Sequence, residues 1–126
     1  MKYIAVKDFE LQILADGTDV TSANPNKATV QTQPNANMKI DGNAAYCGSV
    51  KVQVAGLVVQ GFTQDGSTVF TFNLTAEHVK LDGDLVLLEA DTTEEQTLTF
   101  RSGDNTTTHN IKLVVKKAGQ TTVKGD

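Results

Sequence analysis

Alternation of apolar and polar residues at every second position is the feature that most constrains this chain. In "SVKVQVAGLVVQGF", Val50, Val52 and Val54 fall on one side of a strand, and Lys51 and Gln53 fall on the other. The same period recurs in "STVFTFNL", in "TLTFRS" and, less regularly, in "HNIKLVVKKA". Seventeen threonines and fourteen valines favour strands and disfavour helix interiors. We therefore predict an all-β fold of short antiparallel strands.

Turn signals separate these runs. Asp-Gly pairs between β-branched runs typically form tight hairpins, and a further turn is expected around Gly103. The four pairs are Asp16-Gly17, Asp41-Gly42, Asp65-Gly66 and Asp82-Gly83. The polar stretch "DTTEEQ" at 91–96 is predicted to be a loop. The predicted core consists of inward strand positions: Val50, Val52, Val54, Phe70, Phe72, Leu98, Phe100, Leu113 and Val115.

The chain of 126 residues fits a single domain with one distinctive segment. Residues 16–36, "DGTDVTSANPNKATVQTQPNA", are rich in Thr, Asn and Ala and contain both prolines. Because such a stretch offers few apolar anchors, we expect a loop-dominated arm with a short strand at 28–32. The arm is either a plain surface loop or a segment that lies along another surface.

Charge and apolar patterning exclude several classes of protein. The net charge of −4 and the largest basic cluster, Lys116-Lys117, argue against a nucleic-acid partner. Apolar runs are too short to span a membrane, and charged residues interrupt any signal-peptide core near the N-terminus. We expect a protein made in the cytoplasm without a signal peptide. A single cysteine predicts no internal disulfide.

Catalytic motifs are missing from the sequence. It contains no GxSxG elbow, no HExxH helix motif and no glycine-rich phosphate loop. The acidic pair Glu94-Glu95 lies in a polar run, as is typical of a solvated surface. We therefore predict a protein that is not an enzyme and has no catalytic residues.

A repeated motif is the strongest signal of organisation. "NMKIDGNAAY" at 37–46 and "HVKLDGDLVL" at 78–87 share the order aliphatic, Lys, aliphatic, Asp, Gly. The matching residues are Lys39, Asp41 and Gly42 in the first copy and Lys80, Asp82 and Gly83 in the second. Each copy places an outward lysine between two inward aliphatic residues. "TTVKGD" at the C-terminus is a weaker third copy. The copies are either unrelated hairpins of a sandwich or three units of a pseudo-threefold architecture.

The repeat resembles the "V-x-I-N-G-K-P-A-A-R" element of PAAR and PAAR-like proteins, the conical tips of contractile injection machines. "NMKIDGNAAYCG" carries the likeness best, followed by "HVKLDGDLVLLEAD". Asn43-Ala44-Ala45-Tyr46 stands where the family has Pro-Ala-Ala-Arg. The resemblance implies a small β-rich cap on the blunt end of a trimeric spike.

The resemblance also implies a metal near the apex, held by histidines and a cysteine. The candidates in this chain are Cys47, His78 and His109, with zinc or iron as the metal. These three residues are not equivalent in the repeat register, however. The alternative is a core cysteine and two surface histidines, with His109 in a solvated loop, and this alternative is the one we expect.

The apolar run Leu57, Val58 and Val59 is the candidate partner surface, because a strand with one wet face would alternate instead. Two structural roles agree with all these features. The chain is a spike-tip or spike-associated component of a phage or phage-tail-like particle. Alternatively, it is a virion or capsid decoration or assembly protein that binds a shell protein through the 16–36 arm. A tip occurs once per particle, whereas a decoration protein occurs in many copies.

Overall fold

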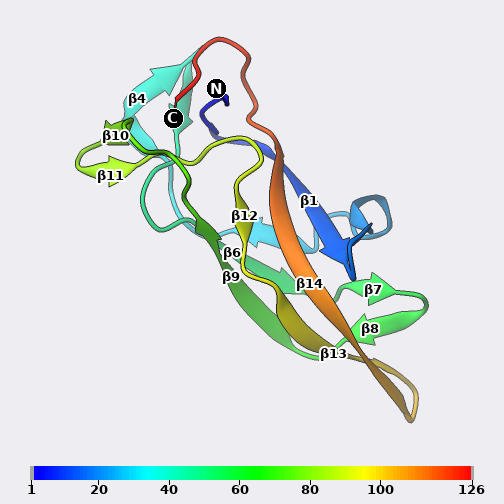
Figure 1. The fold of residues 1–126 in the computed structure, drawn as a ribbon. Coiled ribbons are helices and arrows are strands. Elements are labelled where there is room, and N and C mark those ends of the chain that lie inside the picture. Colours follow the sequence, from blue (N-terminus) through cyan, green and yellow to red (C-terminus); the bar gives the residue numbers. More distant parts are fainter. Residues whose placement is uncertain (1, 126) are drawn as a thin grey trace.

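The computed structural model describes residues 2–125, and most of them lie in or between short strands (Figure 1). Within these residues the single helical element is η1, a 3₁₀ turn at Thr21–Ala23. The strands are β1 Glu10–Ala15, β2 Thr18–Asp19, β3 Ala28–Val30, β4 Asn35–Ile40, β5 Asn43–Ala45, β6 Lys51–Ala55, β7 Val58–Val59, β8 Phe62–Gln64, β9 Ser67–Asn73, β10 Lys80–Leu81, β11 Asp84–Leu85, β12 Thr92–Thr93, β13 Gln96–Ser102 and β14 Asn105–Lys117.

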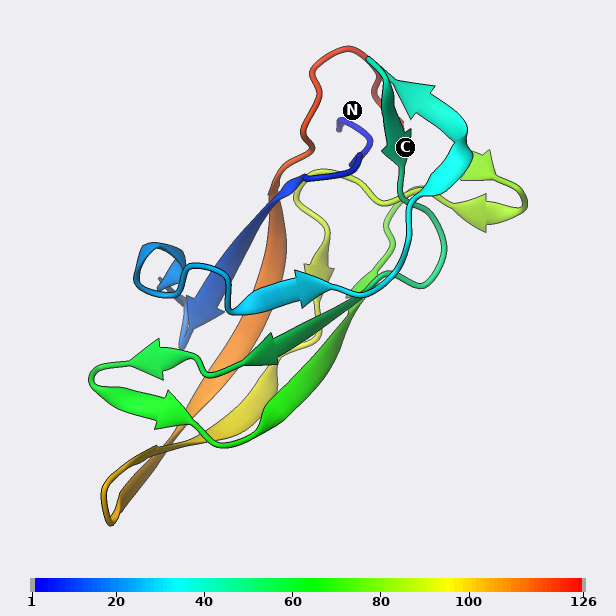
Figure 2. The same cartoon turned by 180° about the vertical axis from the view of Figure 1, so that it is seen from behind.

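Ten strands form one curled sheet, which we call the strand bundle. Its order is β3-β6-β9-β12-β14-β13-β8-β7, with β1 paired to β14 and β2 paired to β1. Every pairing is antiparallel, which confirms the predicted fold class. The hairpins β4–β5 and β10–β11 lie at one end of the bundle, beside both chain ends (Figure 1). Seen from behind, β1 and β3 face each other across the curl (Figure 2).

The main hydrophobic core fills the strand bundle. All nine predicted core residues are buried in it, so the period-two alternation located the core correctly. Phe9 joins this core through edge-to-face contacts with Tyr46 at 5.3 Å and with Phe72 at 6.3 Å between ring centroids. Each large apolar side chain buried here contributes about 1.5–3 kcal/mol to folding. The bundle therefore supplies most of the stability.

A second, smaller core lies beneath the two hairpins. It consists of Ile4, Val6, Ile40, Ala45, Ala76, Val86 and Leu88, with Met38, Cys47, Val79, Leu81, Leu85 and Val123 packed against it. The inward aliphatic residues predicted on either side of each motif lysine thus contact this cluster. We call the two hairpins, the segments at 3–6 and 123–125 and this cluster the hairpin end.

Three of the four predicted Asp-Gly turns have both residues at positive φ, as a type I′ hairpin requires. The φ values are 50° and 83° at Asp16-Gly17, and nearly the same at Asp41-Gly42 and Asp82-Gly83. The pair Asp65-Gly66 is different, because β8 pairs with β7 and β13 and not with β9. There the Asp65 amide donates to the Thr99 carbonyl. The pair is a corner between strands, not a hairpin.

Two segments predicted to be loops are strands. Thr92–Thr93 forms β12 and pairs with both β9 and β14, so part of the 91–96 stretch lies inside the sheet. The Thr93 hydroxyl accepts a hydrogen bond from the Leu113 amide at 3.1 Å. His109 lies within β14 and is buried, so its assignment to a solvated loop was wrong. Both errors arose because threonine-rich runs suit strands as well as loops.

The 16–36 segment packs on its own chain. It contains β2, η1 and β3, and the strand expected at 28–32 is present at 28–30. The buried side chain of Asn24 fixes the segment to β7: it accepts from the Val58 amide at 2.6 Å and donates to the Val58 carbonyl at 3.1 Å. These two hydrogen bonds add to the apolar contacts that Val20, Ala28 and Val30 of the segment make with the main core.

Candidate functional site: the pseudo-threefold hairpin end

Three residues spaced by 41 positions form a closed ring of backbone hydrogen bonds at the hairpin end. The Ala5 amide donates to the Leu87 carbonyl at 2.8 Å, the Leu87 amide to the Tyr46 carbonyl at 3.0 Å, and the Tyr46 amide to the Ala5 carbonyl at 3.0 Å. Each residue donates to one neighbour and accepts from the other. This pattern is that of a threefold axis passing through one chain.

A second set of hydrogen bonds repeats the same rotation. Its donor–acceptor pairs are Lys7 to Ala44, Gly48 to Leu85 and Glu89 to Tyr3, at 2.8 to 2.9 Å. The isolated bridges follow the same cycle: Val6 with Ala45, Cys47 with Val86, and Leu88 with Ile4. In every case the residue numbers advance by 41 from one unit to the next. The hairpin end is therefore pseudo-threefold.

The third unit is divided between the two ends of the chain. In the two complete hairpins, Lys39 pairs with Ala44 and Lys80 pairs with Leu85. In the third unit, Lys124 pairs with Tyr3. The weak C-terminal copy of the motif thus supplies half a hairpin. The segment around Tyr3 supplies the other half.

The motif lysines occupy equivalent positions in the three units. Lys39, Lys80 and Lys124 are all exposed. The Lys124 ammonium lies 5.0 Å from the centre of the Tyr3 ring, a cation–π contact across the strand pair. The hairpin end therefore presents three cationic side chains in threefold arrangement.

The motif aspartates link neighbouring units. Asp82 accepts hydrogen bonds from the side-chain amides of Asn35 at 2.7 Å and Asn37 at 3.0 Å, both on the strand that enters the first hairpin. Asp41 accepts from the Thr122 hydroxyl at 2.8 Å, in the segment that leads into the third unit. The bonds from Asn35 and Asn37 lower the pKa of Asp82. The Asp of the motif thus shapes the turn and joins two units.

The structure does not bring the three predicted metal ligands together. Cys47 packs against the smaller core, His78 is exposed 3.8 Å from Glu77, and His109 lies in the strand bundle. Within residues 2–125, no group of three or more His, Cys, Asp or Glu side chains is placed to hold a metal. The candidates are spaced by 31 residues, whereas the structural period is 41, so they fall at unrelated places.

His109 has a structural contact instead. Its Nδ1 lies 2.6 Å from the Asp16 carboxylate, and its ring meets Phe100 edge-to-face at 5.1 Å. Asp16 also accepts from the Asn110 amide at 2.9 Å. The hydrogen bond with His109, and after it the one from Asn110, lower the pKa of Asp16. They attach the β1–β2 turn to β14.

The predicted partner surface is largely internal. Leu57 and Val59 are buried in the main core, and Val58 between them is 38% exposed. The run therefore alternates like other strands of the bundle. Its own chain covers two of its three side chains.

The segment at 3–6 was missed as part of the repeat, because it carries no Asp-Gly turn of its own. Stepping back by 41 from Tyr46 reaches Ala5, and this spacing was the available signal.

No helix within residues 2–125 has the length and apolar character needed to cross a membrane. No family model, curated protein or solved structure matches the chain.

Proposed function

We propose that this chain is a non-enzymatic structural component of a phage or contractile injection particle, and that it caps a threefold-symmetric spike. The observation that supports this function is the closed ring formed by Ala5, Tyr46 and Leu87. A single chain with three equivalent units can meet three identical subunits with three similar contacts. A chain without such internal symmetry would present a different surface to each of the three subunits.

The hairpin end is the surface we assign to this contact. Its three units share pairing register and an outward lysine at the same place. The opposite end lacks this equivalence, since β1–β2, β7–β8 and β13–β14 differ in length there (Figure 1). The lysines predict acidic groups on the spike, because complementary charge guides association and fixes its register.

Binding to the isolated trimeric spike of the particle tests the proposal, with native mass spectrometry as the readout. We expect one chain per three spike subunits. Changing Lys39, Lys80 and Lys124 together to Glu should weaken binding at least about tenfold, or about 1.4 kcal/mol. Changing the exposed lysines Lys27, Lys51 and Lys116 to Glu is the matched control, with the same change in net charge.

The alternative role is that of a decoration or assembly protein that binds a shell protein through the 16–36 arm. Copy number separates the two roles. Many copies per particle, or three chains per spike trimer, would contradict the cap and favour decoration. Equal losses in the two lysine variants would contradict the assignment of the hairpin end.

A further inference from the structure

The curl of the strand bundle stays open along one line, between β1 and β3. Pairing joins β1 to β14 and, at Leu14 and Ala15, to β2, and it joins β3 to β6. Within residues 2–125 no ladder joins β1 to β3. The corresponding strands of the second unit, β6 and β9, pair directly over five residue positions. One unit of the three therefore has an opening where the second has a continuous sheet. We call it the β1–β3 groove.

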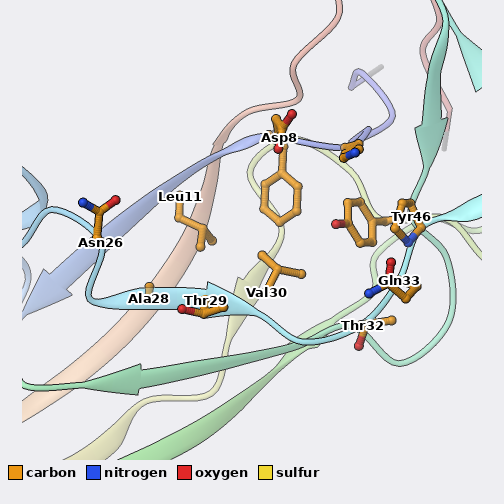
Figure 3. A pocket seen from close by; sticks show the side chains of 12 residues that line it. Asp8, Leu11, Asn26, Ala28, Thr29, Val30, Thr32, Gln33 and Tyr46 are labelled. Atoms are coloured by element: carbon orange, nitrogen blue, oxygen red, sulfur yellow. The ribbon is translucent and has the colours of Figure 1, made fainter.

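The groove is an elongated cavity. A cavity of about 450 Å³ lies between Leu11 of β1 and Ala28 and Val30 of β3 (Figure 3). A second cavity of about 230 Å³ shares Leu11 and Ala28 with it and continues toward Ile13. The larger volume is within the range of about 300–1,000 Å³ typical of ligand sites. The shape follows the two strands.

Main-chain groups of both strands point into the groove. Residues 27 and 31 bond toward β6, since the Ala55 amide donates to the Lys27 carbonyl and the Gln31 amide donates to the Lys51 carbonyl. By the alternation of a strand, the main-chain groups of Ala28 and Val30 point the other way. On the edge of β1 away from β14, the Ile13 carbonyl accepts from the Val20 amide and the Ile13 amide donates to the Thr21 hydroxyl. By alternation the main-chain groups of Leu11 lie on the same edge, and they are the ones that β1 offers to the groove.

The side chain of Tyr46 contributes a polar atom to the groove. Tyr46 is only 5% exposed and lines the cavity, and Figure 3 shows its hydroxyl directed into the space between the strands. No hydrogen bond within residues 2–125 involves this hydroxyl, which is not among the fully buried polar atoms and is therefore open to a ligand. The equivalent ring positions hold Ala5 and Leu87, which have apolar side chains. The unit beside the opening is thus the one that places a polar atom there.

We propose that the β1–β3 groove binds an extended segment of another protein as an added strand. Such a segment offers amides and carbonyls to both edges at once, which fits the facing main-chain groups of Leu11 and Val30. Small or aliphatic side chains would contact Leu11, Ala28 and Val30, and a backbone or polar side-chain group would meet the Tyr46 hydroxyl. This site is independent of the spike contact assigned above.

Selection from a displayed library of linear seven-residue peptides against the wild-type chain tests the groove. We expect enriched peptides that bind wild type and lose at least about tenfold in affinity on Val30→Asp, a change of about 1.4 kcal/mol. Val69→Asp is the matched control, because Val69 is 45% exposed on β9. The Val69→Asp variant should bind the selected peptides as tightly as wild type does.

Two further measurements test the groove without introducing a charge into it. Methylating alternate backbone nitrogens of a selected peptide should abolish binding to the wild-type chain, since an added strand donates those hydrogens. Tyr46→Phe should weaken binding roughly threefold to tenfold, the loss expected for one hydrogen bond. Enrichment of no peptide, or peptides insensitive to both changes, overturns the proposal. Self-association abolished by Val30→Asp would identify a second copy as the occupant and also overturns it.

Discussion

The hairpin end and the strand bundle share a period of 41 residues, but the three units are alike only at the hairpin end. At the hairpin end, Ala5, Tyr46 and Leu87 make the same hydrogen bonds in turn. In the bundle, β1, β6 and β12 begin at positions 10, 51 and 92, yet they contain six, five and two residues. A cyclic set of backbone bonds closes only if each unit has the same geometry. Side-chain packing tolerates units of different length.

The bundle should therefore be the region where single side chains matter most. Phe100 is fully buried in the main core. Phe100→Ala should destabilise the fold by about 3–5 kcal/mol, because it removes apolar burial and leaves a cavity. Urea denaturation followed by fluorescence or circular dichroism gives this value. A loss below about 1 kcal/mol would show that the bundle is not the main source of stability.

The hairpin end should show a smaller loss for a comparable change. Leu88 is 1% exposed but belongs to the smaller cluster. Leu88→Ala should cost about 2–3 kcal/mol, at the low end of the range for buried leucines, because thin hairpins can relax around the cavity. Hydrogen exchange should localise the added opening to residues near Tyr46 and Val86. Uniform faster exchange across β14 would contradict separate regions.

Acid should weaken both regions through carboxylates. Hydrogen bonds from the Thr21 hydroxyl, from Gln12 and from the Thr21 amide lower the pKa of Asp19 in the bundle to about 2. A lowered folded-state pKa stabilises the protein above the unfolded value of about 3.9, and this stability is lost as the pH falls toward 2. Asp19→Asn should flatten that dependence.

Asp82 gives the same test at the hairpin end, where the bonds from Asn35 and Asn37 lower its pKa. Thermal melting of wild type, Asp19→Asn and Asp82→Asn at pH 6, 4, 3 and 2 would compare the two regions. Both effects should be modest, because the side chains are exposed and solvent screens them. Parallel curves for all three proteins would contradict a contribution from these carboxylates.

The smallest effect is expected at Cys47. Val6, Cys47 and Leu88 occupy equivalent positions in the three units, so an aliphatic side chain fits the site by symmetry. Cys47→Val should change stability by less than about 1.5 kcal/mol. Melting with and without a chelator should be unchanged in both proteins. A large loss on substitution would mean that the three positions are not equivalent.

Local patterns in the sequence were sufficient to predict the strands, most turns and the main core. Val50 and Phe100 could be placed because alternation reflects burial on one face of a sheet. The lysine and Asp-Gly motif also located two hairpins correctly. Local patterns could not reveal that Asp65-Gly66 is a corner, because this depends on which distant strand β8 pairs with.

The candidate site could be predicted from the sequence only in part, for a similar reason. Ala5 and Leu87 are ordinary apolar residues, and only their bonds to Tyr46 give them a role. The three metal candidates were named by residue type without a common period, and within residues 2–125 the structure does not bring them together. The β1–β3 groove depends on an absent pairing between two strands, and no local pattern records it.

The division of the third unit between residues near 3 and near 124 has a consequence for the order of folding. Either complete hairpin can form from neighbours in sequence, whereas the pair Tyr3–Lys124 encloses almost the whole described chain. Closing so long a loop costs conformational entropy that the last contacts must offset. We expect the cycle of hydrogen bonds to form late and as a unit, after the strands between residues 3 and 124 have assembled.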